Sequence, residues 1–320
     1  MQQAILALLL LFSFSLAAQT KTIAERLGYS ADAKLVILHA DDLAVAHSED
    51  SASFAALDQH AVSSASIMVP CPWLTEVADY AKAHPDADLG LHLVLTSEWK
   101  TYRWGSVSSS NQVPSLLDPL GTFYPTTEAA AAHAKPDEAE REIRAQVERA
   151  MAVGIMPTHL DSHMGTLFST PELFAAYVKV AHDYHLPFLA VKVADERSKL
   201  LSLLSPNDVV FDAVVVAAPG LQPAARKSFY FDTVKNIKPG LTYFIVHLAY
   251  DDAEARAMMG QNEPFGAAWR QGDFDTVGDV LMERESGGTI GLKAGGEQAG
   301  FEARGAQHGL LGEGHLLEGK

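Results

Sequence analysis

The chain has 320 residues, of which 48% are hydrophobic, so it can build one large domain or two small ones around a sizeable core. Its formal net charge of −16 argues against nucleic acid as a partner, because a phosphate backbone attracts a basic surface. Cys71 is the only cysteine, which excludes an internal disulfide and a cysteine-based zinc site. Any metal site must therefore use histidine and carboxylate side chains.

The first residues have the pattern of a secretory signal. Residues 4–16 are apolar, which fits the central region of a signal peptide but is too short for a membrane span. Ser15 and Ala17 fit a small-x-small cleavage pattern, so we expect residues 1–18 to be removed and the mature protein to be periplasmic or secreted. An uncleaved N-terminal anchor is the alternative. After cleavage we expect no stable insertion in a membrane.

Short apolar runs then alternate with helical patterns. Nearly continuous apolar runs are typical of parallel strands that are buried on both faces. The expected strands lie at residues 34–40, 63–69, 88–96, 157–162, 188–193, 208–216 and 241–249. Helices between such strands predict βα units and a parallel sheet or barrel, built by a domain at residues 19–285.

Two of the expected helices have clear starting signals. The first covers residues 136–154, with Pro136 in its first turn. The second covers residues 170–185, where Thr170 is suited to cap the helix and Pro171 to occupy its first position.

Two segments depart from this alternation. Residues 100–133 form a long polar insertion, which predicts a lid or a binding loop. Aromatic rings in or beside it could stack on a sugar or pack locally, and both interpretations stay open; they belong to Trp99, Tyr102, Trp104, Phe123 and Tyr124. Residues 286–320 are rich in glycine, and we expect a disordered tail or sequence that has lost its ancestral register.

Histidines and aspartates gather at the ends of four expected strands. They are His39, Asp41 and Asp42 in the first, His92 in the third, His159, Asp161 and His163 in or after the fourth, and His247 in a late strand. Because parallel strands end at the same edge of a sheet, we expect these side chains to converge. The repeated chemistry at one edge predicts a site, whereas a single histidine there would not.

The adjacent carboxylates of Asp41 and Asp42 need a neutralising partner, because an ionised carboxylate is costly to bury alone. A divalent metal held by two histidines and one aspartate removes that cost and leaves positions for water and substrate. One aspartate would bind the metal and its neighbour would act as general base. The alternative is that the pair caps a helix after the strand.

Four segments together resemble the YdjC-type carbohydrate deacetylases, a family that includes chitooligosaccharide and hopanoid-biosynthesis deacetylases. They read "LHADDLA", "LGLHLVLT", "PTHLDSHMG" and "IVHLAY", and the resemblance spans roughly residues 34 to 275. It implies an α/β fold, a distorted (β/α) barrel similar to a TIM barrel, with a long insertion after the third strand. It also implies a metal-dependent hydrolase that removes acetyl groups from N-acetylated sugars.

The resemblance implies a role for each matching residue. Asp42, His92 and His163 would bind a divalent metal ion, either zinc or magnesium. Asp41 would be the base, and a protonated His247 would be the general acid. The expected partner is a small N-acetylated saccharide, and a homodimer is left open. Two further residues would orient the ligands by hydrogen bonds, namely His159 and Asp161.

The chain departs from the family pattern at a few positions. His39 stands where the family usually has asparagine, and Lys192 stands where an arginine is common. Met164 and Gly165 replace polar groups after "HLDSH", and Leu43-Ala44 replaces Phe-Gly. These departures leave the identity of the sugar open.

Two other functions remain as alternatives. One is a glycosidase that uses Asp41 and Asp42 as paired carboxylates, in which case chelation of metal should not affect it. The other is a catalytically impaired, exported carbohydrate-binding protein on the same fold, which would bind sugar without releasing acetate.

Overall fold

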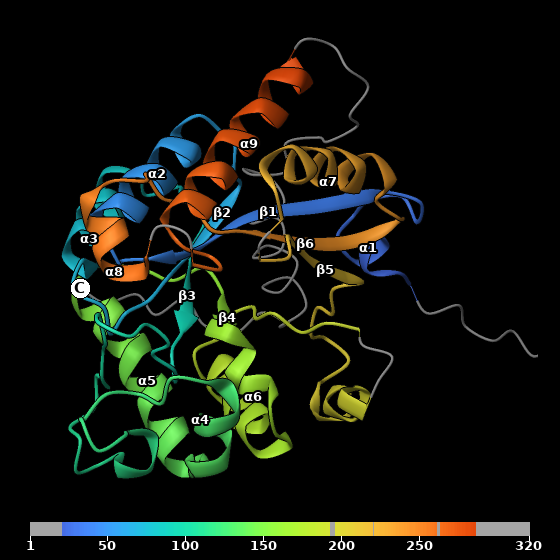
Figure 1. The fold of residues 1–320 in the computed structure, drawn as a ribbon. Coiled ribbons are helices and arrows are strands. Elements are labelled where there is room, and N and C mark those ends of the chain that lie inside the picture. Colours follow the sequence, from blue (N-terminus) through green and yellow to red (C-terminus); the bar gives the residue numbers. More distant parts are fainter. Residues whose placement is uncertain (1–20, 193–195, 220, 261–262, 286–320) are drawn as a thin grey trace, which may run out of the picture.

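The computed structural model describes residues 21–192, 196–219, 221–260 and 263–285. Six strands in this part of the chain form one parallel sheet in the order β4-β3-β2-β1-β6-β5. Their bounds are β1 Lys34–Leu43, β2 Ser64–Ile67, β3 Leu89–Leu93, β4 Leu160–Ser162, β5 Ala213–Val216 and β6 Gly240–Val246. The predicted α/β fold is confirmed: the sheet curls into a partial barrel, with helices on its outer side (Figure 1).

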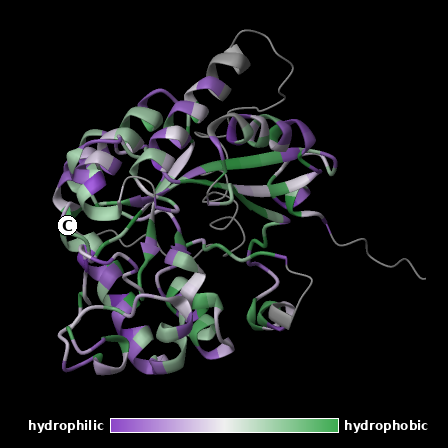
Figure 2. Cartoon of the chain, in the orientation of Figure 1, coloured by the Kyte–Doolittle hydropathy of each residue, from purple (hydrophilic) through white to green (hydrophobic). Residues whose placement is uncertain are grey.

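The longest strand, β1, lies in the middle of the sheet. It pairs with β6 from Lys34↔Gly240 to Ala40↔Val246, and its second half pairs with β2. Both β1 and β6 are largely hydrophobic (Figure 2), as expected for strands covered on both faces. This central position places the C-terminal end of β1, which carries the paired aspartates, between the ends of its neighbours.

The arc between β4 and β5 is irregular, and here two strand predictions need correction. Of the strand predicted at 188–193, the described residues 188–192 form no continuous strand; Phe188 pairs with Leu160 and Val191 with Phe211 as isolated parallel bridges. The strand predicted at 208–216 is reduced to β5. Pro187 has no amide hydrogen to donate to a ladder, which favours this broken pairing. The two bridges span the gap between the sheet edges, so the barrel is distorted as expected.

Helices connect the strands. Their bounds are α1 Ile23–Arg26, α2 His47–Asp58, α3 Leu74–Ala83, α4 Thr127–His133, α5 Pro136–Ala152, α6 Pro171–Asp183, α7 Pro223–Asn236, α8 Ala253–Met259 and α9 Ala267–Glu285, with 3-10 turns η1 Pro114–Leu116, η2 His163–Phe168 and η3 Glu196–Leu203. Both predicted helices are confirmed: Pro136 begins α5, and the Thr170 hydroxyl accepts a hydrogen bond from the Leu173 amide at the start of α6. Among the described residues, no helix has both the length and the apolar character needed to cross a membrane.

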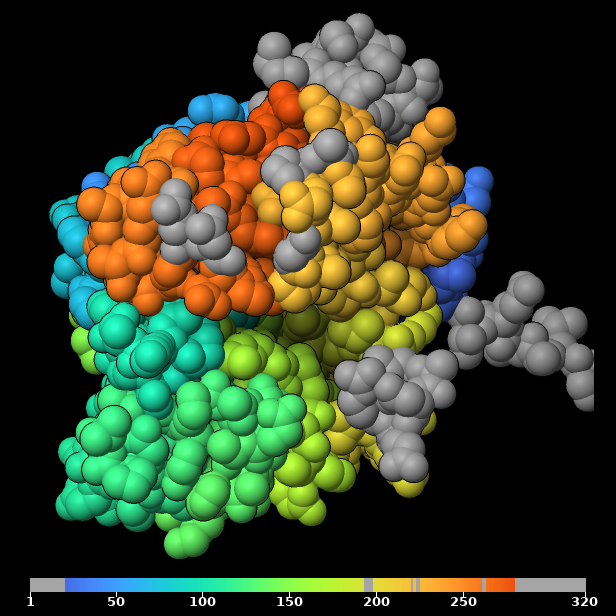
Figure 3. Space-filling model, in the orientation of Figure 1, coloured from blue at the N-terminus to red at the C-terminus, as the bar shows by residue number. Residues whose placement is uncertain are grey.

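The insertion after β3 is more ordered than a simple loop. It contains η1 and α4, and Trp104 and Phe123 are buried within it. The Trp104 indole also donates a hydrogen bond to the Thr96 carbonyl at 2.8 Å. The rings of Trp104 and Phe123 therefore pack locally. The insertion also borders α8, where the Thr101 hydroxyl reaches the Ala257 carbonyl at 3.3 Å (Figure 3). The predicted signal peptide at 1–18 and the predicted tail at 286–320 lie outside the described residues.

Candidate metal centre and active site

A change of register at the end of β1 aims both adjacent aspartates into one site. In a regular strand, neighbouring side chains point to opposite faces. Here the pairing with β2 shifts between Ala40 and Leu43, and Asp42 has a φ of 74°. As a result, Asp41 Oδ2 lies 3.7 Å and Asp42 Oδ1 lies 3.4 Å from the same atom, His92 Nε2. Such irregularities often lie beside active sites, where they redirect a side chain.

The turn after β1 does not use the aspartate pair as a helix cap. Helix α2 begins after Ala46, which has no side-chain cap, so the capping interpretation is wrong. Ala44 also has a positive φ of 75°, and its amide donates a 2.6 Å hydrogen bond to Asp50 from α2. This contact holds the strained turn, and both aspartates remain free to face the site.

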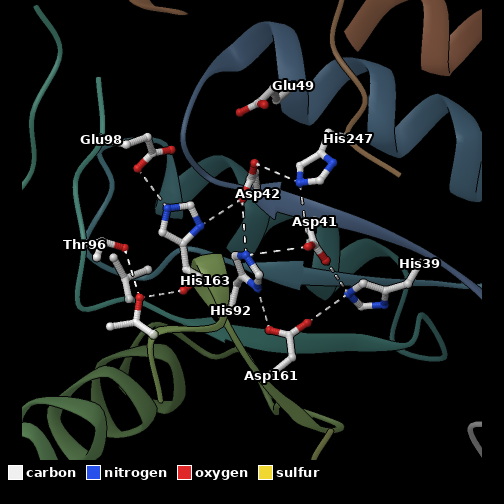
Figure 4. A network of polar contacts seen from close by, with 12 residues as sticks. His39, Asp41, Asp42, Glu49, His92, Thr96, Glu98, Asp161, His163 and His247 are labelled. Carbon is white, nitrogen blue, oxygen red and sulfur yellow. Dashed lines mark hydrogen bonds and ion pairs between the residues drawn. The ribbon is translucent and has the colours of Figure 1, made fainter. Parts of the chain in front are cut away.

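Asp42, His92 and His163 form a compact, buried triad (Figure 4). Asp42 Oδ1 lies 3.4 Å from His92 Nε2 and 3.5 Å from His163 Nδ1. Atoms that share one tetrahedral ion, with bonds of about 2.0–2.1 Å, would lie about 3.3 Å apart. The structure therefore brings the three predicted ligands to a spacing that fits a single metal ion.

Carboxylates hold the far sides of both imidazoles. His92 Nδ1 lies 2.6 Å from Asp161 Oδ1, and His163 Nε2 lies 3.0 Å from Glu98 Oε2. Histidines that bind metals usually have such partners, which fix the ring and its tautomer. Asp42 Oδ1, in contrast, is buried without a hydrogen-bond partner. These atoms fit a cation. Both imidazoles face Asp42 Oδ1, and this oxygen has no hydrogen-bond partner in the structure that would take the place of a metal ion.

Arg270 of α9 supports the other oxygen of Asp42. Its buried guanidinium lies 2.9 Å from Asp42 Oδ2 and also contacts Glu49. Of the residues that the structure describes, Arg270 alone brings a permanent positive charge within ion-pair distance of these two carboxylates. One arginine faces two buried carboxylates here, so without a metal ion the remaining negative charge of the site has to be balanced by bound protons.

The two imidazoles of the triad are strongly basic without a metal. Burial lowers the pKa of His92, but Asp161 and Asp41 outweigh it and raise the value to about 9. Burial likewise opposes ionisation of His163, whereas the charge of Glu98 helps to raise its pKa to about 10. Metal binding would have to displace these protons.

The two aspartates differ in charge although they are neighbours. Burial raises the pKa of Asp41 to about 8. Burial acts in the same direction on Asp42, but there the Arg270 guanidinium reverses it and holds the pKa well below its usual range. Asp42 is therefore the permanently ionised member of the pair, and Asp41 is the carboxylate that can exchange a proton.

His247, at the end of β6, closes the site on the side opposite His163. Its Nε2 lies 3.9 Å from Asp41 Oδ2 and 4.0 Å from Asp42 Oδ2, while its amide donates to Asp273 at 3.2 Å. Burial lowers the pKa of His247 to about 3, so the imidazole is neutral. Burial therefore opposes the protonated His247 that a general acid requires, because the nearby carboxylates do not outweigh the loss of solvent.

Of the remaining residues singled out in the sequence, Asp161 contacts the triad, whereas His159, Lys192 and Met164 make other contacts or face solvent. Asp161 orients His92 as expected, but His159 instead pairs with Asp88 at 3.5 Å. Lys192 is exposed and forms an ion pair with Asp212. Met164 is 46% exposed, with a left-handed φ of 52°, so it turns outward directly after the ligand His163.

Sequence reasoning missed three charged residues of the site: Glu98, Arg270 and Glu49. Glu98 lies at the start of the insertion, and Arg270 lies in the last described helix, far from any of the four motifs. No local pattern distinguishes them from surface residues. Only their contacts in the folded chain reveal their part in it: Glu98 pairs with His163, and Arg270 pairs with Asp42 and Glu49.

Comparison with known proteins identifies the family. The family model described as YdjC-like protein matches residues 35–283. The chain belongs to this family. The match includes all residues of the YdjC-like site described above, and it confirms the resemblance seen in the motifs. Among the relatives, a carbohydrate deacetylase from Thermus thermophilus is 33% identical over 244 residues, which cover 73% of this chain and 84% of that protein.

Other similar proteins share less sequence with this chain. A chitooligosaccharide deacetylase from Yersinia enterocolitica is 29% identical over 184 residues, covering 56% of this chain and 68% of that protein. A solved structure from Enterococcus faecalis V583, described as a cellobiose-phosphate cleavage protein, aligns with a TM-score of 0.65 at 21% identity. That alignment covers 78% of this chain and 95% of the other, and it shows a shared fold.

Proposed function

We propose that this protein is a metal-dependent deacetylase of N-acetylated sugars or oligosaccharides. The observation that carries the proposal is the buried triad of Asp42, His92 and His163, with Asp41 beside it. Membership in the YdjC-like family and the names of the relatives support a carbohydrate substrate. The chemistry proposed is hydrolysis of the acetamide C–N bond, giving acetate and a free amino sugar.

Asp42, His92 and His163 would hold the ion, with Asp161 and Glu98 fixing the two imidazoles. A divalent ion supplies a Lewis acid for the acetyl carbonyl and lowers the pKa of a bound water toward about 7. Two imidazoles and one carboxylate favour zinc over magnesium. Metal analysis of protein purified without chelator or added metal identifies the ion.

Asp41 and His247 would handle the protons. Asp41 Oδ2 faces the triad, and in its ionised form, which becomes dominant as the pH rises through the pKa of about 8, it takes the proton of the attacking water as base. The nitrogen of an amide leaves poorly unless it gains a proton. Asp41 Oδ2 lies 3.9 Å from Nε2 of the neutral His247. The proton that Asp41 has taken from the water can therefore pass to His247, which delivers it to the departing amine and so acts as the general acid.

An acetate-release screen over N-acetylated sugars tests the function. We expect release that stops after chelation and returns when zinc or another divalent ion is added. Sugar binding without acetate release by the metal-loaded protein would instead support the carbohydrate-binding alternative. Cleavage of a glycosidic bond that survives chelation would support the glycosidase, although adjacent Asp41 and Asp42 both face His92 and do not flank a bond between two sugars.

We also propose that the enzyme acts outside the cytosol. The apolar run at residues 4–16 and the cleavage pattern after it support this location. N-terminal sequencing of protein recovered from the periplasm or medium tests it, with a start after Ala17 or Ala18 as the expected result.

A further inference from the structure

His39 occupies a central position between the predicted base and the support of the metal triad. It lies in β1 opposite Ser64 of β2, and it is fully buried. Its Nδ1 lies 2.9 Å from the Ser64 hydroxyl. Its Nε2 lies 3.3 Å from Asp41 Oδ1 and 3.3 Å from Asp161 Oδ2 (Figure 4).

The two carboxylates determine the tautomer of His39. When Asp41 is ionised, a bare lone pair on Nε2 would face two acceptor oxygens at equal distance, which is repulsive in a buried site. With the proton on Nε2, the N–H group faces both oxygens at 3.3 Å without the alignment of a full hydrogen bond to either one, and Nδ1 accepts a hydrogen bond from Ser64. Burial lowers the pKa of His39 to about 4, so the ring is neutral and carries this one proton.

We propose that His39 is a positioning residue for the general base, an inference that rests on the proposed deacetylase function. The Nε2 side of His39 lies 3.3 Å from Asp41 Oδ1 and attracts it electrostatically, so that Oδ2 is the oxygen turned toward His92 and His247. The same side of the ring attracts Asp161, whose other oxygen orients His92. One imidazole proton therefore sets both the direction of the base and the support of a metal ligand.

The surroundings of His39 fix its ring for this purpose. The ring packs against the Tyr243 ring of β6 at a centroid distance of 4.7 Å and against His159 at 5.2 Å. The Tyr243 hydroxyl donates to Asp161 Oδ2 at 3.0 Å, beside the contact from His39. The imidazole thus has little freedom to rotate away from the two carboxylates.

The tautomer can be tested without any enzyme assay. In protein labelled with ¹⁵N-histidine, the His39 ring signals are assigned by their absence from the His39→Gln variant. We expect a neutral ring with its proton on Nε2. A proton on Nδ1, or a doubly protonated ring, would overturn the proposal, because neither state gives the single shared donor described above.

Two variants separate the positioning role from simple packing. His39→Gln keeps an amide donor near the position of Nε2, whereas His39→Leu has comparable bulk and no donor. We expect His39→Leu to lower kcat roughly 10- to 100-fold, the usual effect of losing a partner behind a metal site, with KM little changed. His39→Gln should recover most of that loss.

The outcomes distinguish this proposal from the function on which it rests. If wild-type protein releases acetate and His39→Leu, folded and loaded with metal, keeps the full kcat, the positioning role is wrong. Equal losses in the Gln and Leu variants would also overturn it, since only packing would then matter. If wild-type protein releases no acetate from any sugar, the deacetylase proposal fails, while the tautomer measurement still tests the geometry around His39.

Discussion

Asp41 and Asp42 are chemically identical neighbours whose environments assign them different tasks. Asp42 has the Arg270 guanidinium on Oδ2 and two imidazoles near Oδ1. Asp41 has no arginine or lysine within ion-pair distance among the described residues, and burial raises its pKa to about 8. The fixed charge therefore belongs to the proposed ligand, and the exchangeable proton belongs to the proposed base.

The pair gives a direct prediction at this scale. Asp41→Asn should bind the metal normally but lose turnover by a factor on the order of 10²–10⁴, because an amide cannot accept the proton of the attacking water. Asp42→Asn should lose the metal itself. Metal content and kcat, measured together on both variants, check this, and full kcat in metal-loaded Asp41→Asn would show that another group is the base.

Arg270 is the residue whose loss should cost the most stability. Arg270→Met leaves Asp42 and Glu49 buried without their cation, which should destabilise the protein by about 3–5 kcal/mol. Arg144→Met removes the partially exposed partner of Glu140 and should cost about 1 kcal/mol or less. Unfolding by urea compares the two, and equal losses would mean that the buried network contributes no more than a surface pair.

At the scale of single elements, strand ends matter more than strand interiors. The register shift at the end of β1 turns two successive side chains to one site, which a regular strand cannot do. In β3, Gly90 leaves room for the His159 ring: a Cβ added there would lie 2.3 Å from His159 Nε2. The absence of a side chain at Gly90 allows the start of β3 to lie close to the start of β4.

Gly90→Ala should therefore displace His159 and destabilise the protein by roughly 1–3 kcal/mol, the usual cost of overpacking. Gly278→Ala in α9 is a matched control, since its added Cβ would meet no atom within 4 Å and alanine favours a helix. Thermal unfolding measures both. A neutral Gly90→Ala variant would indicate that the ring of His159 moves aside freely.

At the scale of the whole molecule, the site is assembled from segments spread along almost the entire described chain. β1, β3, β4 and β6 deliver the histidines and aspartates, the insertion after β3 delivers Glu98, and α9 delivers Arg270. The sheet order brings these segments together at one edge. Metal binding should consequently stabilise the fold as a whole, because an ion at this place links distant parts of the chain.

The pH dependence of that stabilisation follows from the two basic imidazoles. In metal-free protein, the raised pKa values of His92 and His163 add stability below about pH 6.5. This stability is lost as the pH rises through their folded values of about 9 and about 10. A metal requires neutral imidazoles, so its affinity should rise over the same range. The difference in Tm between zinc-loaded and chelated protein should widen from pH 6 to pH 9, and a constant or narrowing difference would contradict the ligand assignment.

The sequence by itself determined the parts that depend on local pattern. Periodicity and caps predicted α5 and α6, apolar runs predicted the parallel strands, and residue type at the strand ends predicted a metal site of histidine and carboxylate, within which the resemblance to the YdjC-type family assigned the triad and Asp41. These features are local because helix caps, strand patterns and metal-ligand chemistry are written in a few adjacent residues.

Only the tertiary structure decided which partners these residues have. It replaced the strand expected at 188–193 by two isolated bridges, buried the rings of Trp104 and Phe123, and made His247 neutral. It also placed Glu98 and Arg270 against the triad. Each of these outcomes depends on burial and on contacts between residues far apart in the chain, and such contacts are set by packing of the whole domain and not by any short stretch of sequence.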